Sequence, residues 1–253
     1  MRRTYSLAGA AIGATAVLAL GAGPALAATG SVNANLAPVA GNGVDGSGTA
    51  MVEVKGTKIT VTMAAMGLLA DQPHAAHIHF GADARHECPT SDDDSDGNGR
   101  LTTSEGVPAY GPVVVSLTKT GDTSAKSALA VDRFDTASGG EISYERGSIT
   151  VDSGVASAIA DGEAVVVIHG VDHNDDGKYS GNAKSDLDPS LPAEATDPAL
   201  CGVLSKAPTG GMQTGQGGAA GGQDNGLVGL GGAAILAAAG WAAVAVRRIR
   251  AQV

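Results

Sequence analysis

The sequence predicts an all-β fold, a Greek-key sandwich or barrel of about eight antiparallel strands, with one transmembrane helix at its C-terminal end. Short runs in which apolar and polar residues alternate recur at fairly even spacing, which is typical of antiparallel sandwiches and barrels. Glycine-containing turn signals separate these runs. Between the two ends of the chain, no stretch carries a helical apolar stripe over three turns.

The strands are expected in the following order. Thr49 to Lys55 and Lys58 to Met63 flank Gly56 and predict a hairpin. Further strands are expected at Val113 to Leu117, Ser127 to Phe134, Ile142 to Val151 and Ala164 to His169. The turn signals between them are Gly121-Asp122, Gly139-Gly140 and Asp161-Gly162. We therefore expect one β domain over 28–205.

The N-terminal residues 1–27 resemble a secretory signal peptide. Arg2 and Arg3 precede a short apolar run, and Ala25-Leu26-Ala27 provides a cleavage site with small residues. The chain is therefore expected to be exported, and its mature form to begin near Ala28.

The C-terminal end predicts a membrane anchor. A Gly- and Gln-rich stalk is expected over 206–226, because its composition shows no apolar periodicity. Residues 227–246 are uncharged and long enough to span a bilayer, and the basic tail 247–253 marks the cytoplasmic side. The partner of this end is thus the cell membrane, with the β domain outside. Alternatively, an enzyme of the sortase kind removes the helix near Met212-Gln213-Thr214-Gly215 and leaves the domain on the cell wall.

The exported part is strongly acidic. Residues 28–226 hold 11 Lys and Arg and 26 Asp and Glu, a net charge of −15, against −10 for the whole chain. This charge argues against nucleic acid or an anionic membrane surface as a partner. Cys88 and Cys201 both lie in this part, and two thiols in an oxidising compartment are expected to form one disulfide.

All six histidines fall into two short segments. His74, His77, His79 and His86 lie within 13 residues of one another, and His169 and His173 lie near the end of the domain. In a strand, residues two apart face the same side, so His77 and His79 are expected to point together. With His169, which ends an apolar strand, they form a ligand set that suits copper or zinc. The alternative is a group of ordinary hydrogen-bonded histidines.

Four motifs resemble copper/zinc superoxide dismutases in order and spacing over roughly 73–204. They are His74-x-x-His77-x-His79, Cys88, the strand Val165-Val-Val-Ile-His169, and Leu200-Cys201-Gly202-Val203. The resemblance implies a Greek-key barrel, His77, His79 and His169 as copper ligands, His74 as a supporting histidine and a Cys88–Cys201 disulfide. It also implies superoxide as the substrate.

The sequence departs from that family at two places. Residues 89–110 contain no histidine, so neither the usual zinc site nor the histidine that bridges copper and zinc is encoded. His86 and His173 are candidate additional ligands in its place. Pro198 stands where the family has an arginine that attracts superoxide, so we expect slow capture of an anion.

Residues 46–81 also resemble chordin-type repeat (CHRD) domains, through Thr49-Ala-Met-Val-Glu-Val and Ala75-Ala-His-Ile-His79. Those domains are β-sandwich modules of exported proteins. This resemblance implies a non-catalytic module of the cell surface. It also indicates that a His-Ile-His sequence occurs outside enzymes.

Two acidic segments resemble the beginning of a calcium-binding loop, in which oxygen ligands alternate before a glycine. The candidate ligands are Asp92, Asp94, Asp96 and Asn98 in the first segment and Asp172, Asn174 and Asp176 in the second. Counted from Asp92, the twelfth position is Thr103 and not the expected glutamate. The alternative is a pair of solvated acidic turns.

Three functions follow from these patterns. The first is a surface-anchored, copper-dependent superoxide dismutase that works without zinc. The second is a non-catalytic module that binds copper or calcium. The third is a structural surface domain in which the histidines hold no metal.

Overall fold

The structure of the protein, a computed structural model, describes residues 27–206. The predicted signal peptide, stalk, transmembrane helix and basic tail lie outside the described residues, apart from the boundary residues Ala27 and Lys206. Within the described range, no helix is long and apolar enough to cross a membrane.

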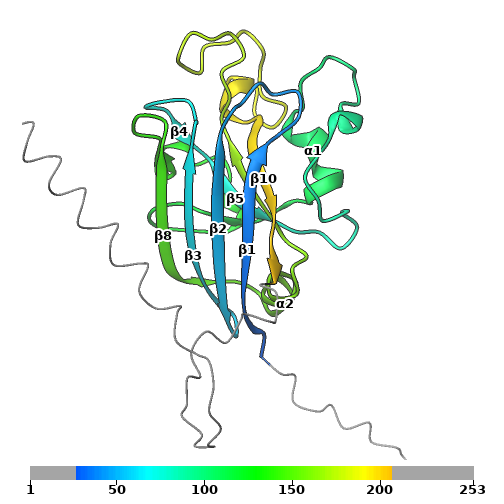
Figure 1. The fold of residues 1–253 in the computed structure, drawn as a ribbon, viewed down its shortest axis with the longest axis vertical. Coiled ribbons are helices and arrows are strands. Elements are labelled where there is room, and N and C mark those ends of the chain that lie inside the picture. The colour runs from blue at the N-terminus through cyan, green and yellow to red at the C-terminus, as the bar shows by residue number, and fades with distance from the viewer. Residues whose placement is uncertain (1–26, 207–253) are drawn as a thin grey trace, which may run out of the picture. The chain divides into compact units, whose positions relative to one another are not determined.

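Antiparallel β-structure dominates the described residues (Figure 1). The main sheet has nine strands: β1 (Thr29–Pro38), β2 (Ser47–Lys55), β3 (Lys58–Met66), β5 (Ala76–His79), β6 (Val113–Ser116), β8 (Ile142–Thr150), β9 (Val165–His169), β10 (Pro198–Val203) and β11 (Ser205–Lys206). A second, two-stranded sheet pairs β4 (Pro73–His74) with β7 (Asp135–Thr136). The all-β class predicted from alternation is confirmed.

The main sheet runs in the order β6-β5-β9-β10-β1-β2-β3-β8, and β11 pairs with β1. Consecutive hairpins join β1, β2 and β3, and the predicted turn at Gly56 lies between the second and the third strand. The chain later inserts β9 between β5 and β10, and returns through β10 to the free side of β1. Strands far apart in sequence therefore become neighbours, and this brings the segment around His169 beside the segment around His77.

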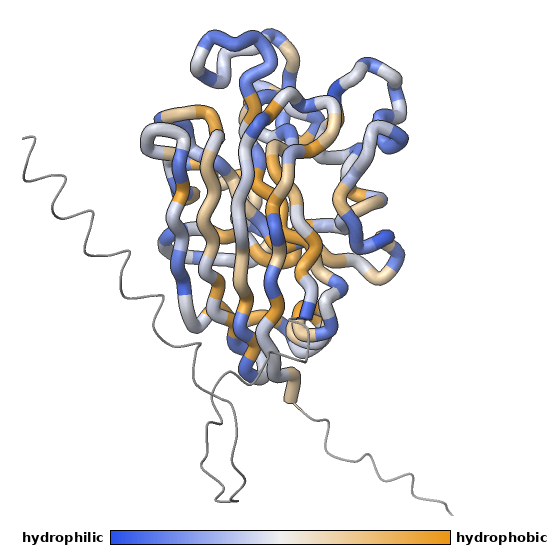
Figure 2. The backbone as a smooth tube through the Cα atoms, viewed as in Figure 1, coloured by the Kyte–Doolittle hydropathy of each residue, from blue (hydrophilic) through white to orange (hydrophobic). Residues whose placement is uncertain are grey.

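The sheet curls into a half-barrel whose concave side holds the core. Along β1, β2 and β3 every second residue is buried, as the two-residue period of a strand requires. Val52, Val61, Ile78 and Ile168 are completely buried members of this core. Figure 2 shows the corresponding alternation of orange and blue along the strands. The burial of this apolar core supplies the main stabilisation of the fold.

Side chains of β8 connect the two ends of the curled sheet. Tyr144 Oη donates a hydrogen bond of 3.3 Å to the Thr118 carbonyl, two residues beyond β6. Arg146 Nη1 donates to the same carbonyl at 2.5 Å. β6 and β8 are the first and last strands of the sheet order. The curl of the sheet therefore brings the chain beside its two ends within hydrogen-bond distance.

Short helices lie in the connections. α1 (Thr103–Tyr110) follows the first acidic segment, and α2 (Ser153–Asp161) packs against β1 and β2. The 3₁₀ turns are η1 (Ser91–Asp93), η2 (Ala125–Ser127), η3 (Val131–Arg133) and η4 (Ala193–Ala195). Both α-helices are shorter than three turns, so they escape a search for long helical stripes.

One predicted strand is wrong. Residues 127–134 contain the end of η2 and all of η3, and belong to no strand. Local polar contacts explain the difference: the Ser124 side chain caps η2, and Ser127 Oγ donates to Asp122 Oδ2 while accepting from Arg133 Nη2. Serine side chains that bond nearby groups in this way favour turns over strand pairing.

Candidate metal centre

Three histidines lie on one face of two neighbouring strands. In the register of β5 with β9, His77 is opposite Val167 and His79 is opposite Val165. Opposed residues of an antiparallel pair face the same side, and His169 lies two residues beyond Val167. All three histidines therefore project from the convex face, while Ile78 turns to the core.

The convex face is covered at this point, so the histidines are buried. His77, His79 and His169 keep 4%, 1% and 3% of their surface exposed. A small apolar cluster of Val39, Leu101, Tyr110, Val165, Val167, Cys88 and Cys201 lies beside them. The Tyr110 ring of α1 lies 4.4 Å from the His79 ring, which brings this helix over the site.

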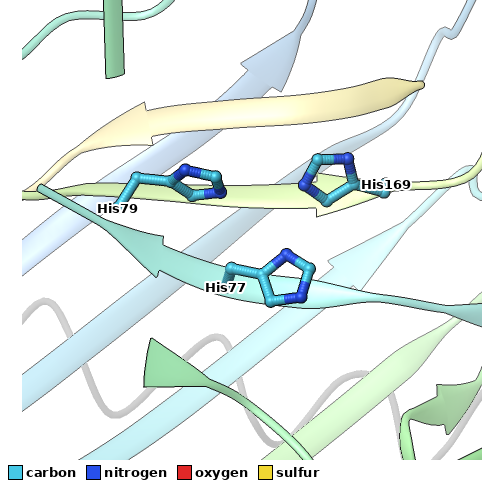
Figure 3. A group of neighbouring side chains, drawn as sticks. All are labelled: His77, His79 and His169. Atoms are coloured by element: carbon cyan, nitrogen blue, oxygen red, sulfur yellow. The ribbon is translucent and has the colours of Figure 1, made fainter. Parts of the chain in front are cut away.

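The three imidazoles converge on one point (Figure 3). Each offers one ring nitrogen, and these three nitrogens all lie within 4.8 Å of one another. An ion with metal–nitrogen bonds of about 2.0–2.1 Å spans at most about 4 Å between two ligands. Small ring rotations would therefore complete a three-nitrogen site.

Backbone carbonyls determine which nitrogen of each ring carries the proton. His77 Nε2 donates to the Ala128 carbonyl at 3.1 Å. His79 Nδ1 donates to the Gly111 carbonyl at 2.8 Å, and His169 Nδ1 donates to the Thr196 carbonyl at 2.6 Å. A carbonyl only accepts, so these nitrogens bear hydrogen and the opposite nitrogen of each ring holds a lone pair.

The opposite nitrogens have no hydrogen-bond partner. Among residues 27–206, four buried side-chain atoms lack a partner, and three of them are His77 Nδ1, His79 Nε2 and His169 Nε2. The fourth is Asp197 Oδ1. A buried polar atom without a partner costs about 1–3 kcal/mol, and here three such atoms point toward one another. Metal-binding histidines show this pattern, with one nitrogen bonded to a carbonyl and the other free for the ion.

Burial keeps these rings neutral. It lowers the pKa of His79 to about 3 and the pKa of His169 to about 4, and lowers the pKa of His77 well below its usual value. For His77 and His79, repulsion from the neighbouring histidines acts in the same direction. Neutral imidazole is the form that binds copper or zinc, so the donor set fits such an ion at physiological pH.

The structure places the remaining histidines elsewhere. His74 is buried in β4, and its Nδ1 lies 2.9 Å from the His169 carbonyl, so it contacts the backbone of a ligand candidate. His86 Nε2 donates to the Gly81 carbonyl, and its ring stacks on Phe80. His173 Nε2 bonds Asp197 Oδ2 at 2.9 Å. Neither His86 nor His173 joins the three-histidine group.

The predicted disulfide is confirmed. Cys88 and Cys201 are joined with a Cα–Cα distance of 5.7 Å, and the bond closes a loop of 113 residues. It attaches the segment between β5 and α1 to β10. Because that segment and α1 cover the histidines, the disulfide holds the cover of the site in place.

The first acidic segment gathers ligands in a register two residues later than the sequence interpretation. Asp94, Asp96 and Glu105 come together, and Asp92 lies outside the group, in η1. Counted from Asp94, glycine is the sixth residue and Glu105 is the twelfth, which is the complete pattern of the calcium loop in EF-hand proteins. The sequence therefore contains the complete calcium-loop pattern, which begins at Asp94 and not at Asp92, the first aspartate of the run.

The second acidic segment has the same backbone arrangement. Asp94 accepts hydrogen bonds from the backbone NH of the residues four and five positions later, and Asp172 does the same. Gly99 and Gly177, the sixth residues, both have φ of +81°, a conformation that glycine adopts without strain. The twelfth residue of the second segment is Ala183, which provides no ligand.

Comparisons with protein-family models and with curated proteins find no match for this chain.

Proposed function

We propose that this chain is an exported copper-binding protein whose metal site is His77, His79 and His169. The observation that carries the proposal is the convergence of three buried imidazole nitrogens, each without a hydrogen-bond partner and each on a ring oriented by a backbone carbonyl. The all-nitrogen, neutral donor set suits copper, which imidazole binds in preference to most divalent metals.

The likeness to copper/zinc superoxide dismutases supports this proposal. In the strand order β10-β1-β2-β3, a late strand lies beside the first of three hairpin-connected strands, an arrangement similar to the Greek key that the resemblance implies. The disulfide and the strand positions of the three histidines agree with the same resemblance.

Superoxide is the candidate substrate that the resemblance provides. When bound, copper would supply one-electron redox chemistry, by which two superoxide anions and two protons would become dioxygen and hydrogen peroxide. The residues of the chain would hold the ion, shield it from bulk water and keep the three rings in fixed tautomers. Where copper/zinc superoxide dismutases have an arginine that attracts superoxide, this chain has Pro198. We therefore expect turnover to be slow.

Metal analysis of the purified full chain tests the copper proposal. We expect about one copper per chain, and loss of that copper in His79→Gln and His169→Gln, whereas His86→Gln retains it. A superoxide assay on the same samples then separates an enzyme from a binding module. A chain that takes up no copper under these conditions would refute the proposal and leave a structural surface domain.

Calcium binding at Asp94–Glu105 is a second proposal, and the position of Glu105 favours it. Glu105 lies within reach of Asp94 and Asp96, and it is ionised at neutral pH. Burial raises its pKa, but hydrogen bonds from Thr102 and Ser95 outweigh that effect and lower the pKa to about 2. A carboxylate at the twelfth position is the ligand that closes such a loop.

Titration calorimetry of calcium into the full chain tests this second site. The control is a substitution at an aspartate that lies outside the assigned loop. Glu105→Gln removes the charge of the closing ligand and should weaken binding about tenfold or more. Asp92→Asn lies outside the loop and should leave binding unchanged. If Asp92→Asn weakens binding and Glu105→Gln does not, the assigned register is wrong; if the wild-type chain gives no calcium heat, the site itself is absent.

A further inference from the structure

A small cavity borders two of the three histidines. It has a volume of about 30 Å³ and is lined by His77 and His169 but not by His79. A space of this size holds one or two water-sized molecules. It therefore leaves room for a small molecule beside two of the three candidate ligands.

The walls of this cavity are mainly apolar. Leu129, Val131 and Leu187 are among the lining residues, and Leu187 is 44% exposed. The only side-chain hydroxyls in the lining belong to Thr103 and Thr196, and both already donate hydrogen bonds, to the Thr196 carbonyl and to Ser185 Oγ. No Lys or Arg is among the lining residues, so the cavity has no group that would compensate the charge of an entering anion.

The nearest charge makes the entry of an anion still less favourable. The carboxylate of Asp186 is close enough to His169 to act on it electrostatically, and Asp186 precedes the lining residue Leu187 in the sequence. Moving an anion from water into an apolar space without a partner is costly, and a neighbouring carboxylate adds repulsion. An uncharged diatomic molecule has neither penalty.

We propose that this cavity selects small uncharged diatomic molecules, of the size and polarity of dioxygen or carbon monoxide, as ligands of the metal held by the three histidines. The inference rests on the proposed copper site alone. Because superoxide is an anion, the inference favours a copper-binding module over a superoxide dismutase. Leu187 is the specificity-determining residue, because it is the exposed residue of the lining, follows Asp186 in the sequence and carries no charge.

Two probes of different charge test the proposal on the copper-loaded full chain. Carbon monoxide is added to the reduced protein and followed by its infrared stretching band. Azide is titrated into the oxidised protein and followed by its absorption band. We expect carbon monoxide to bind in a ratio of one per copper and azide to bind weakly.

Variants of Leu187 provide the charge control, and because this side chain is exposed they leave the core intact. Leu187→Arg should strengthen azide binding about tenfold and leave carbon monoxide binding unchanged, whereas Leu187→Gln should change neither. Tight azide binding by the wild-type protein, or no carbon monoxide band, would overturn the inference while leaving copper binding in place. Absence of copper in the metal analysis, made before either probe is added, would overturn the proposed function and this inference with it.

Discussion

Acid should destabilise the metal-free protein well above the pH at which carboxylates titrate. Burial lowers the pKa of His79 to about 3 and that of His169 to about 4, against 6.5 for the exposed group. Between pH 7 and pH 5 the unfolded chain therefore binds two protons that the folded chain does not. A group whose folded pKa is lowered in this way loses its contribution to stability as the pH falls below 6.5.

The size of the effect follows from the pKa values. Each such proton changes the free energy of unfolding by about 1.4 kcal/mol per pH unit, so His79 and His169 each account for about 2 kcal/mol between pH 7 and pH 5. The two together remove about 4 kcal/mol, and His77 acts in the same direction. Burial raises the pKa of Asp197, and a raised carboxyl pKa acts on the pH dependence in the opposite direction. Glu105, with a pKa of about 2, titrates below this range.

Urea denaturation at pH 7 and pH 5, with metal removed by a chelator, measures this difference. His79→Leu takes away one of the titrating rings and should reduce the difference in stability between pH 7 and pH 5 by about 2 kcal/mol. Equal stability at the two pH values, within about 1 kcal/mol, would show that the three rings are hydrated or already protonated in the folded state. That result would contradict the buried, neutral site.

Three further predictions concern the fold. Cys88→Ser with Cys201→Ser should lower the free energy of unfolding by about 4–5 kcal/mol, because the bond closes a 113-residue loop; urea denaturation with intact and substituted cysteines measures it. Ile78→Ala should cost about 2–5 kcal/mol, since Ile78 is fully buried in the core, but folded protein should bind as much copper as the wild type, because this side chain faces away from the histidines. Tyr144→Phe removes the hydrogen bond to Thr118 and should cost about 0.5–1.5 kcal/mol in thermal or chemical denaturation.

The positions of the candidate metal ligands could be predicted because they depend on strand geometry. His77 and His79 share a face through the two-residue period of a strand, and His169 ends a run of apolar residues typical of a buried strand. What the sequence does not reveal is which nitrogen of each ring is free. That depends on the carbonyls of Ala128, Gly111 and Thr196, which lie 27 to 51 residues away along the chain.

Other elements were missed for local reasons. β1 buries Val32, Ala34 and Leu36, but two of its outward residues are asparagines, which are rare in strands, and its signal is therefore weak. Glu105 was not predicted as a calcium ligand, because the twelfth position counted from Asp92 is Thr103. Counted from Asp94, the sequence itself places Glu105 at the twelfth position. The strand predicted over 127–134 fails because serine caps and side-chain contacts outweigh its alternating pattern.

Two kinds of structure, paired strands and loops, determine the geometry of the candidate metal centre. The paired strands β5 and β9 fix the spacing of the three histidines, since the register of a buried sheet cannot slip without turning every side chain over. Loops fix the orientation of the rings, through one carbonyl for each histidine. The Thr196 carbonyl illustrates this, because it accepts from both His169 Nδ1 and Thr103 Oγ1, and Thr103 is the tenth residue of the loop that Glu105 closes. The orientation of the His169 ring is therefore connected to the acidic loop, so we expect a substitution in that loop to change the candidate metal site while the sheet stays the same.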